Sequence, residues 1–139
     1  MGDFNDDPNN KSVEDVLGAV GDRDEVTENS IFYNPMMSFY KKGIGTSCYR
    51  DKWNVLDQVH VSPSLLGESD TNWYFWKAGI FNPSYLYNKK GRYKGYPFRS
   101  FAGGKFTGGN SDHFPVYALS HIHISEPTRR RSISYAVFC

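Results

Sequence analysis

A carboxylate stands in the middle of a valine stripe, and no other feature of the sequence constrains the fold as strongly. The segment from Trp53 to Ser62 alternates as a β-strand does, with Val55, Asp57, Val59 and Val61 on one face. If this face is buried, Asp57 needs a partner, because an unpaired charge is costly in an apolar interior. If the face points outward, or the strand is out of register, no partner is required. The stripe therefore predicts either a buried polar site built on this strand or a solvent-exposed face.

Two short polar motifs lie at opposite ends of the chain. They read Gly2-Asp3-Phe4-Asn5 and Ser111-Asp112-His113-Phe114-Pro115. If the first motif is locally extended, the side chains of Asp3 and Asn5 point to the same side. Hard oxygen ligands of this kind suit Mg²⁺, which binds through one or two carboxylates together with waters and a substrate phosphate. Taken singly, each motif is explained equally well as a turn.

The two motifs, with Asp57 between them, resemble the signatures of the endonuclease/exonuclease/phosphatase superfamily, whose members are built like DNase I. The resemblance includes a segment in which Trp53, Leu56, Asp57 and Ser62 match a family pattern. It implies an α/β fold, part of a DNase I-like layered sandwich with a mixed or antiparallel sheet and a flanking helix. The first motif lies near the middle of the domain in that family. Residues 1–118 are therefore expected to be a C-terminal half, without the Asn and the metal-binding Glu that the N-terminal half supplies.

The resemblance also implies a role for each polar residue. Asp3 would position or deprotonate the attacking water, and Asn5 would hydrogen-bond the phosphoryl group. His113 would stabilise charge on a phosphoryl oxygen, with Asp57 orienting its ring. Asp112 and Asp3 would hold Mg²⁺ or Mn²⁺. The implied reaction is hydrolysis of a phosphodiester or phosphomonoester, and the motifs do not separate nucleic acid, lipid headgroup and small-molecule substrates. A half-domain of this kind is expected to be inactive or unstable on its own.

Two other functions remain open. A non-catalytic member of the family could keep the fold and act as a binding module, although such a protein has no need to retain all five polar residues. A carbohydrate- or protein-binding β-rich domain is suggested only by the aromatic content of 17%.

Residues 85–101 interleave aromatic and basic side chains, including Tyr93, Lys94, Tyr96 and Arg99. Such a pattern can stack bases while neutralising phosphates. It describes an exposed hairpin equally well, with its rings packed on the sheet and its cations in solvent. Arg99 is the residue we expect near a substrate phosphate if the first interpretation holds.

Local signals predict several further elements. Ser12 with Asp15 forms a capping-box pattern that predicts a helix N-cap. Strands are expected over 73–80 and 113–118, and an irregular packed connection over 31–40. Cys48 has no neighbours that suggest reactivity, and a lone cysteine excludes a disulfide within residues 1–118.

The C-terminal residues carry a different signal. From His121 the sequence resembles a translated sequencing-library adaptor, so residues 119–139 are expected to be a non-native tail. Without this tail, 13 basic and 14 acidic residues remain of the 16 and 15 in the whole chain. This balance gives no support for a broad nucleic-acid-binding surface.

No apolar run reaches the roughly 20 residues of a membrane span, so we expect a soluble protein. The sequence leaves its location and oligomeric state open.

Overall fold

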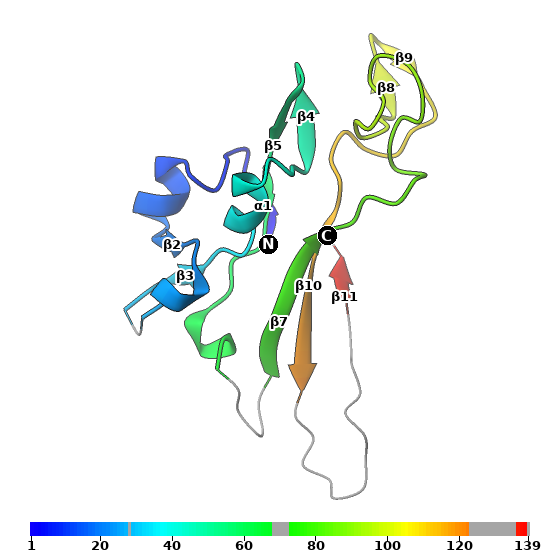
Figure 1. Cartoon of the computed structure of the whole chain (residues 1–139). Helices are drawn as coiled ribbons and strands as arrows, with labels where there is room; N and C mark the ends of the chain where they lie inside the picture. Colours follow the sequence, from blue (N-terminus) through cyan, green and yellow to red (C-terminus); the bar gives the residue numbers. More distant parts are fainter. Residues whose placement is uncertain (28, 68–72, 123–135, 139) are drawn as a thin grey trace, which may run out of the picture.

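The computed structural model describes residues 1–27, 29–67, 73–122 and 136–138 (Figure 1). The elements are, in chain order, β1 (Gly2–Asp3), η1 (Ser12–Val16), β2 (Ala19–Val20), η2 (Arg23–Glu25), β3 (Phe32–Tyr33), α1 (Met37–Lys41), β4 (Ser47–Tyr49), β5 (Lys52–Asn54), β6 (Asp57–Gln58), η3 (Pro63–Leu65), β7 (Trp73–Ile80), β8 (Phe101–Ala102), β9 (Lys105–Phe106), β10 (Val116–Ile122) and β11 (Ala136–Phe138). Small mixed sheets with few helices place the chain in the α/β class.

The longest strands, β7 and β10, pair antiparallel and lie side by side in Figure 1. β11 pairs with the other edge of β10, which gives a three-stranded sheet in the order β11-β10-β7. The strand predicted over 73–80 is confirmed, since β7 covers Trp73–Ile80. In the described part of the chain the remaining sheets are two-stranded, and of these only the β2–β3 sheet is parallel.

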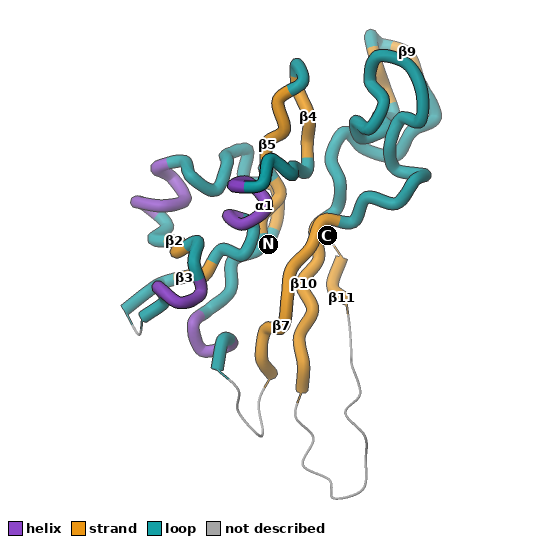
Figure 2. The backbone as a smooth tube through the Cα atoms, viewed as in Figure 1, coloured by secondary structure: helices purple, strands orange, loops and turns teal. Residues whose placement is uncertain are grey.

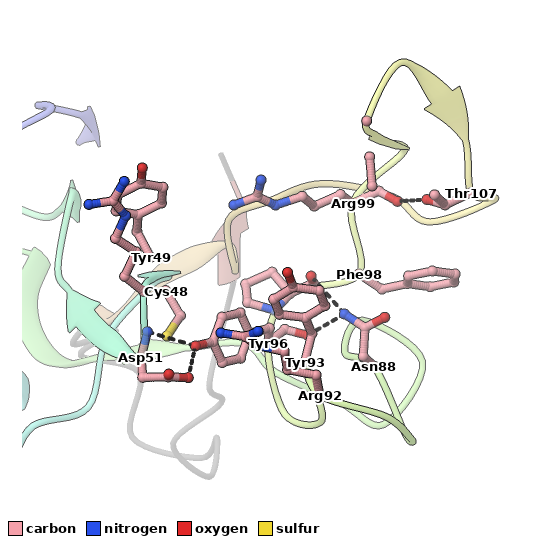
Figure 3. Close-up of a pocket in the computed structure, with 14 residues that line it drawn as sticks. Cys48, Tyr49, Asp51, Asn88, Arg92, Tyr93, Tyr96, Phe98, Arg99 and Thr107 are labelled. Carbon is pink, nitrogen blue, oxygen red and sulfur yellow. Dashed lines mark hydrogen bonds between the residues drawn. The ribbon is translucent and has the colours of Figure 1, made fainter.

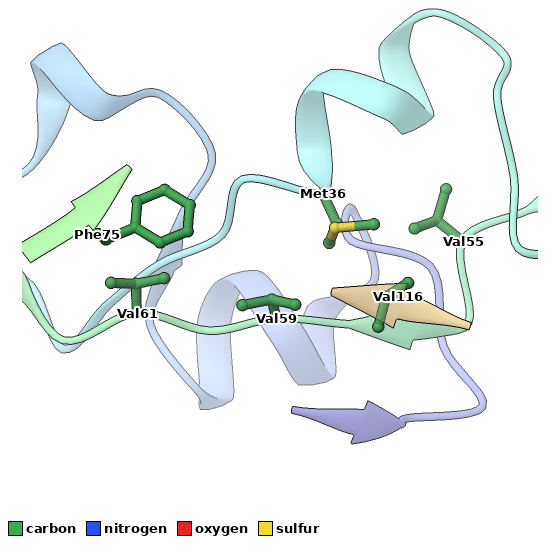
Figure 4. Close-up of a cluster of buried hydrophobic side chains, with 6 residues drawn as sticks. All are labelled: Met36, Val55, Val59, Val61, Phe75 and Val116. Carbon is green, nitrogen blue, oxygen red and sulfur yellow. The ribbon is translucent and has the colours of Figure 1, made fainter. Parts of the chain in front are cut away.

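One hydrophobic cluster joins the sheet to the N-terminal segments. It consists of Met36, Val55, Val59, Val61, Phe75 and Val116, all with at most 6% of their surface exposed (Figure 4). Phe75 comes from β7 and Val116 from β10, whereas the three valines come from the predicted valine stripe. The stripe therefore faces the core, and the alternative that it points outward is wrong.

The segment from Trp53 to Ser62 changes its backbone partner along its length, so the prediction of one continuous strand is wrong. β5 pairs with β4, β6 pairs with β1, and Val61 pairs with Tyr33. The interruption between β5 and β6 has a physical cause, because side chains replace the strand partner there. The carboxylate of Asp7 accepts a hydrogen bond from the Val55 N–H at 2.7 Å.

The predicted Ser12 N-cap is also wrong. Lys11 is the N-cap residue of the π-helix η1, and no side-chain cap is formed. Ser12 instead donates its hydroxyl to the carboxylate of Asp6 at 2.6 Å, and Asn10 donates to the other oxygen of that carboxylate at 2.6 Å. These two bonds hold the pKa of Asp6 below its ordinary value. Ser12 is therefore the first residue of the helix, and its hydroxyl is oriented toward Asp6 rather than toward the N–H groups of the first turn.

Residues 81–115 connect β7 to β10 as a long excursion that is almost entirely loop (Figure 2). Its only strands are the short pair β8 and β9. The chain closes on itself behind this hairpin, because the Asn110 N–H donates to the Phe98 carbonyl at 2.8 Å and the Ser100 hydroxyl donates to the Asn110 carbonyl at 2.8 Å. The excursion returns to the sheet through Ser111, Asp112 and His113.

β10 begins at Val116 rather than at His113 and continues past Leu119 to Ile122, with a register shift against β7 between Leu119 and Ser120. The proposed tail boundary at 119 thus falls inside a strand that pairs with β7. Most of the proposed tail, residues 123–135 and 139, lies outside the described residues. Within the described part of the chain, no helix has the length and apolar character needed to cross a bilayer.

Candidate functional site

Three polar side chains from the three expected segments meet beside the sheet. Asp3 on β1 and Asp57 on β6 are direct cross-strand partners. The Nδ1 atom of His113 lies 2.8 Å from the Oδ2 atom of Asp57 and 4.0 Å from the Oδ2 atom of Asp3. The side chains of Asp57 and His113 are 17% and 22% exposed, whereas Asp3 is 42% exposed. A half-buried His–Asp pair with a more accessible carboxylate at its edge is the central feature of the site.

His113 is held by its neighbours on both sides. It forms an isolated bridge with Ser47, and its N–H donates to the Ser111 hydroxyl at 3.1 Å. The next residue, Phe114, is 2% exposed and stacks on Trp53 with ring centroids 6.1 Å apart. Because Phe114 is locked in the interior, the imidazole beside it has little freedom to move away from Asp57.

Asp57 is positioned by a residue that the sequence did not single out. The hydroxyl oxygen of Thr46 accepts hydrogen bonds from the N–H groups of Leu56 and Asp57, at 3.1 and 3.2 Å. The Thr46 carbonyl accepts from the Phe114 N–H at 2.8 Å. One buried threonine therefore connects the strand of Asp57 with the segment of His113, and no local pattern in the sequence indicates this.

Gln58 provides a second support that sequence reasoning missed. Its side chain donates to the Asp6 carbonyl at 2.6 Å and accepts from the Asn34 side chain at 2.7 Å. Both amides are fully buried. Gln58 follows Asp57 directly and, by strand alternation, lies on the opposite face of the segment, so that face is also covered here.

Asp3 and Asn5 form a tight local turn. The Asn5 N–H donates to the Oδ1 atom of Asp3 at 2.9 Å. Asn5 has a φ of 54°, in the left-handed region that asparagine tolerates better than most residues. The extended backbone of β1 therefore ends at Asp3, and the turn at Asn5 leaves both side chains exposed.

Asp112 and Arg99 line one concavity of about 330 Å³, together with Ser100, Phe101, Asn110 and Ser111. This placement links the expected substrate-binding arginine to the motif that carries His113. The Asp112 carbonyl is anchored by the Ser47 hydroxyl at 3.3 Å, while its side chain is exposed. Among the described residues, no three His, Cys, Asp or Glu side chains converge as a complete metal cage.

His60 is a second histidine near the first motif, without a role in the site. Neither of its ring nitrogens has a hydrogen-bond partner, and its ring packs edge-on against Phe4 at 4.6 Å. Burial, with a smaller contribution from the positive N-terminus, lowers its pKa from 6.5 to about 4. His60 is therefore a neutral packing residue beneath the Gly2–Asn5 turn.

The comparison with known families agrees with this geometry. The model of the Endonuclease/Exonuclease/phosphatase family matches residues 1–122. The chain belongs to this family. No curated protein and no solved structure matches the chain. Proteins of the Endonuclease/Exonuclease/phosphatase family are usually hydrolases of phosphate esters and generally use divalent metals, so membership suggests a phosphoesterase- or nuclease-type function for this domain.

Proposed function

We propose that this chain carries the C-terminal part of the active site of a Mg²⁺-dependent phosphoesterase with a DNase I-like sandwich. The hydrogen bond between His113 and Asp57, with Asp3 facing the same imidazole nitrogen, is the observation that supports this most strongly. A structural ion pair would not require a second carboxylate, Asp3, at its edge. A hydrolytic site does require one, because an acid–base group must lie within reach of the attacking water.

Each residue has a distinct task in this proposal. Asp57 accepts the Nδ1 proton of His113, which fixes the ring so that Nε2 faces the substrate side. In its protonated form His113 donates from Nε2 to a phosphoryl oxygen and stabilises the charge that develops there. Asp3 orients or deprotonates the water, and Asn5 donates its side-chain amide to the phosphoryl group.

The donor set fits a hydrated Mg²⁺ ion. Asp3 is exposed, and its Oδ1 atom accepts one hydrogen bond from Asn5, which leaves carboxylate lone pairs for a ligand. Asp112 supplies a second exposed carboxylate. One or two carboxylates are typical for Mg²⁺, whose other positions are filled by waters and phosphate. When bound, the ion would neutralise charge on the phosphoryl oxygens.

The test is hydrolysis by the full-length gene product, followed with bis-p-nitrophenyl phosphate, p-nitrophenyl phosphate and plasmid DNA. We expect activity on at least one of these, lost with EDTA and restored by Mg²⁺. Asp3→Asn should reduce kcat by about 10²-fold or more, the range of positioned acid–base groups. Asp24→Asn, in the exposed helix η2, is the matched control and should retain full activity. Metal-independent hydrolysis, or equal activity of Asp3→Asn and wild type, would contradict the proposal. A folded protein inactive on all three substrates would favour a binding module.

A further inference from the structure

A pocket of about 360 Å³ lies between the β4–β5 hairpin and the 81–115 excursion. From the structure we infer that this pocket binds one nucleotide unit of the substrate, with the base against its tyrosine rings and the phosphates on its arginines. This inference rests on the proposed function, which it deepens by naming a nucleic acid as the substrate class.

The charge of the lining selects an anion. Among the 14 lining residues, Arg50, Arg92 and Arg99 are basic and Asp51 is the single acidic residue, which leaves a net charge of +2. The Asp51 carboxylate is already engaged, because it accepts a hydrogen bond from the Tyr96 phenol (Figure 3). This bond is the main reason why the pKa of Tyr96 is raised. The arginines are therefore available for phosphate oxygens, which a planar guanidinium binds in a bidentate manner.

The rings of the lining select a flat apolar group. Tyr49 and Tyr93 line the pocket although 61% and 58% of their surfaces remain exposed. The guanidinium groups of Arg50 and Arg92 lie 5.2 and 6.0 Å from these two rings. Aromatic rings that carry cations form platforms for nucleobases, since every base offers a π-face. A phosphate site alone would not need the tyrosines, and a lipid headgroup without a ring would leave them uncovered.

Tyr96, in the lining of the pocket, joins the 81–115 excursion to the rest of the domain. The Tyr96 phenol oxygen accepts a hydrogen bond from the Asp51 N–H at 2.8 Å, which connects the excursion to the β4–β5 hairpin. The Tyr96 ring lies 5.5 Å from Tyr93 and 6.0 Å from Trp53, and Trp53 stacks on Phe114 beside His113. A continuous row of rings thus runs from the pocket to the residue that follows the catalytic imidazole.

Arg99 connects the pocket to the candidate active site. It lines this pocket and also the concavity that contains Asp112. In Figure 3 its side chain extends from the excursion toward the side of the pocket on which Tyr49 lies. A nucleotide in the pocket could therefore share Arg99 with a phosphate at the catalytic end.

Equilibrium binding to the full-length protein, in EDTA so that no hydrolysis occurs, tests the inference. The probes are AMP, ribose 5-phosphate and inorganic phosphate. AMP should bind at least about fivefold more tightly than ribose 5-phosphate, because only AMP offers a base that stacks on the tyrosine rings. Tyr93→Ala should remove this difference. The matched control is Tyr85→Ala, which is 60% exposed on the same excursion but does not line the pocket, and it should leave AMP binding unchanged.

Two results would overturn the inference. One is equal affinity of the wild type for AMP and ribose 5-phosphate, and the other is equal weakening of AMP binding by Tyr85→Ala and Tyr93→Ala. Asp3→Asn separates this inference from the proposed function, because it should abolish hydrolysis while the preference for AMP remains. If Asp3→Asn still hydrolyses substrate at the wild-type rate, the proposed function fails and the pocket assignment stands on its own binding data.

Discussion

Replacement of Thr46 by valine tests whether one buried hydroxyl holds the two halves of the site together. Thr46 is 0% exposed, and its hydroxyl oxygen accepts from the backbone N–H groups of Leu56 and Asp57. Valine has almost the same shape but cannot accept, so two N–H groups lose their partner. A buried donor without a partner costs about 1–3 kcal/mol. Because Leu56 and Asp57 are only partly buried, we expect a total loss of about 2–3 kcal/mol in the free energy of unfolding.

The assay is urea denaturation of the purified protein, combined with the rate of bis-p-nitrophenyl phosphate hydrolysis. Thr46→Ser keeps the acceptor and should lose only the packing of one methyl group, about 1 kcal/mol. Thr27→Val, at an exposed position, should change stability by less than about 0.5 kcal/mol. If Thr46→Val were as stable as Thr46→Ser, the hydroxyl would not be the link that positions Asp57, and the argument would be refuted.

Two further predictions concern His60 and Gly109. The unfolded state takes up a proton on His60 at pH 6.5, whereas the folded state does so only at about pH 4, so the wild type should lose stability as the pH falls through this window. After a discount for partial exposure, the free energy of unfolding should fall by about 1–2 kcal/mol. Thermal unfolding of His60→Phe should lack this part of the pH dependence. If the pH dependence of His60→Phe equals that of the wild type, the imidazole is not desolvated. A Cβ atom at Gly109 would lie well inside van der Waals contact of the Phe98 and Arg99 carbonyl oxygens, so Gly109→Ala should displace the excursion and raise KM for phosphodiesters. Gly67→Ala, where a Cβ would meet no atom within 4 Å, should leave KM unchanged, and equal KM values for the two variants would contradict the argument.

The partnership of Asp57 and His113 could be predicted from the sequence because it depends on residue types in a fixed order. A carboxylate inside an apolar stripe requires a donor, and the resemblance to the family indicated which histidine supplies it. The β7 strand could also be predicted, since its pattern is local. The β7 prediction depends on residues close in sequence, whereas the pairing of Asp57 with His113, 56 residues apart, depends on the order of the motifs in the family.

The supports of the site could not be predicted, because they come from contacts between distant segments. Asp7 accepts from the Val55 N–H across 48 residues, and Gln58 donates to the Asp6 carbonyl across 52 residues. Thr46 follows Gly43-Ile44-Gly45, a stretch whose sequence suggests only flexibility. The sequence pattern of residues 85–101 predicted aromatic and basic side chains together, but only the fold brings the β4–β5 hairpin against them to form a pocket.

The most direct test of the central claim is the turnover of Asp57→Asn in the full-length protein with Mg²⁺. The substitution keeps the shape of the side chain and removes the charge that faces Nδ1 of His113 at 2.8 Å. If the His–Asp pair is part of a hydrolytic site, kcat for bis-p-nitrophenyl phosphate should fall by about 10²-fold or more, while KM and the urea midpoint should stay close to those of the wild type. Wild-type kcat in a folded Asp57→Asn protein would contradict this claim, because the His–Asp pair would then be a structural contact and not part of a hydrolytic site.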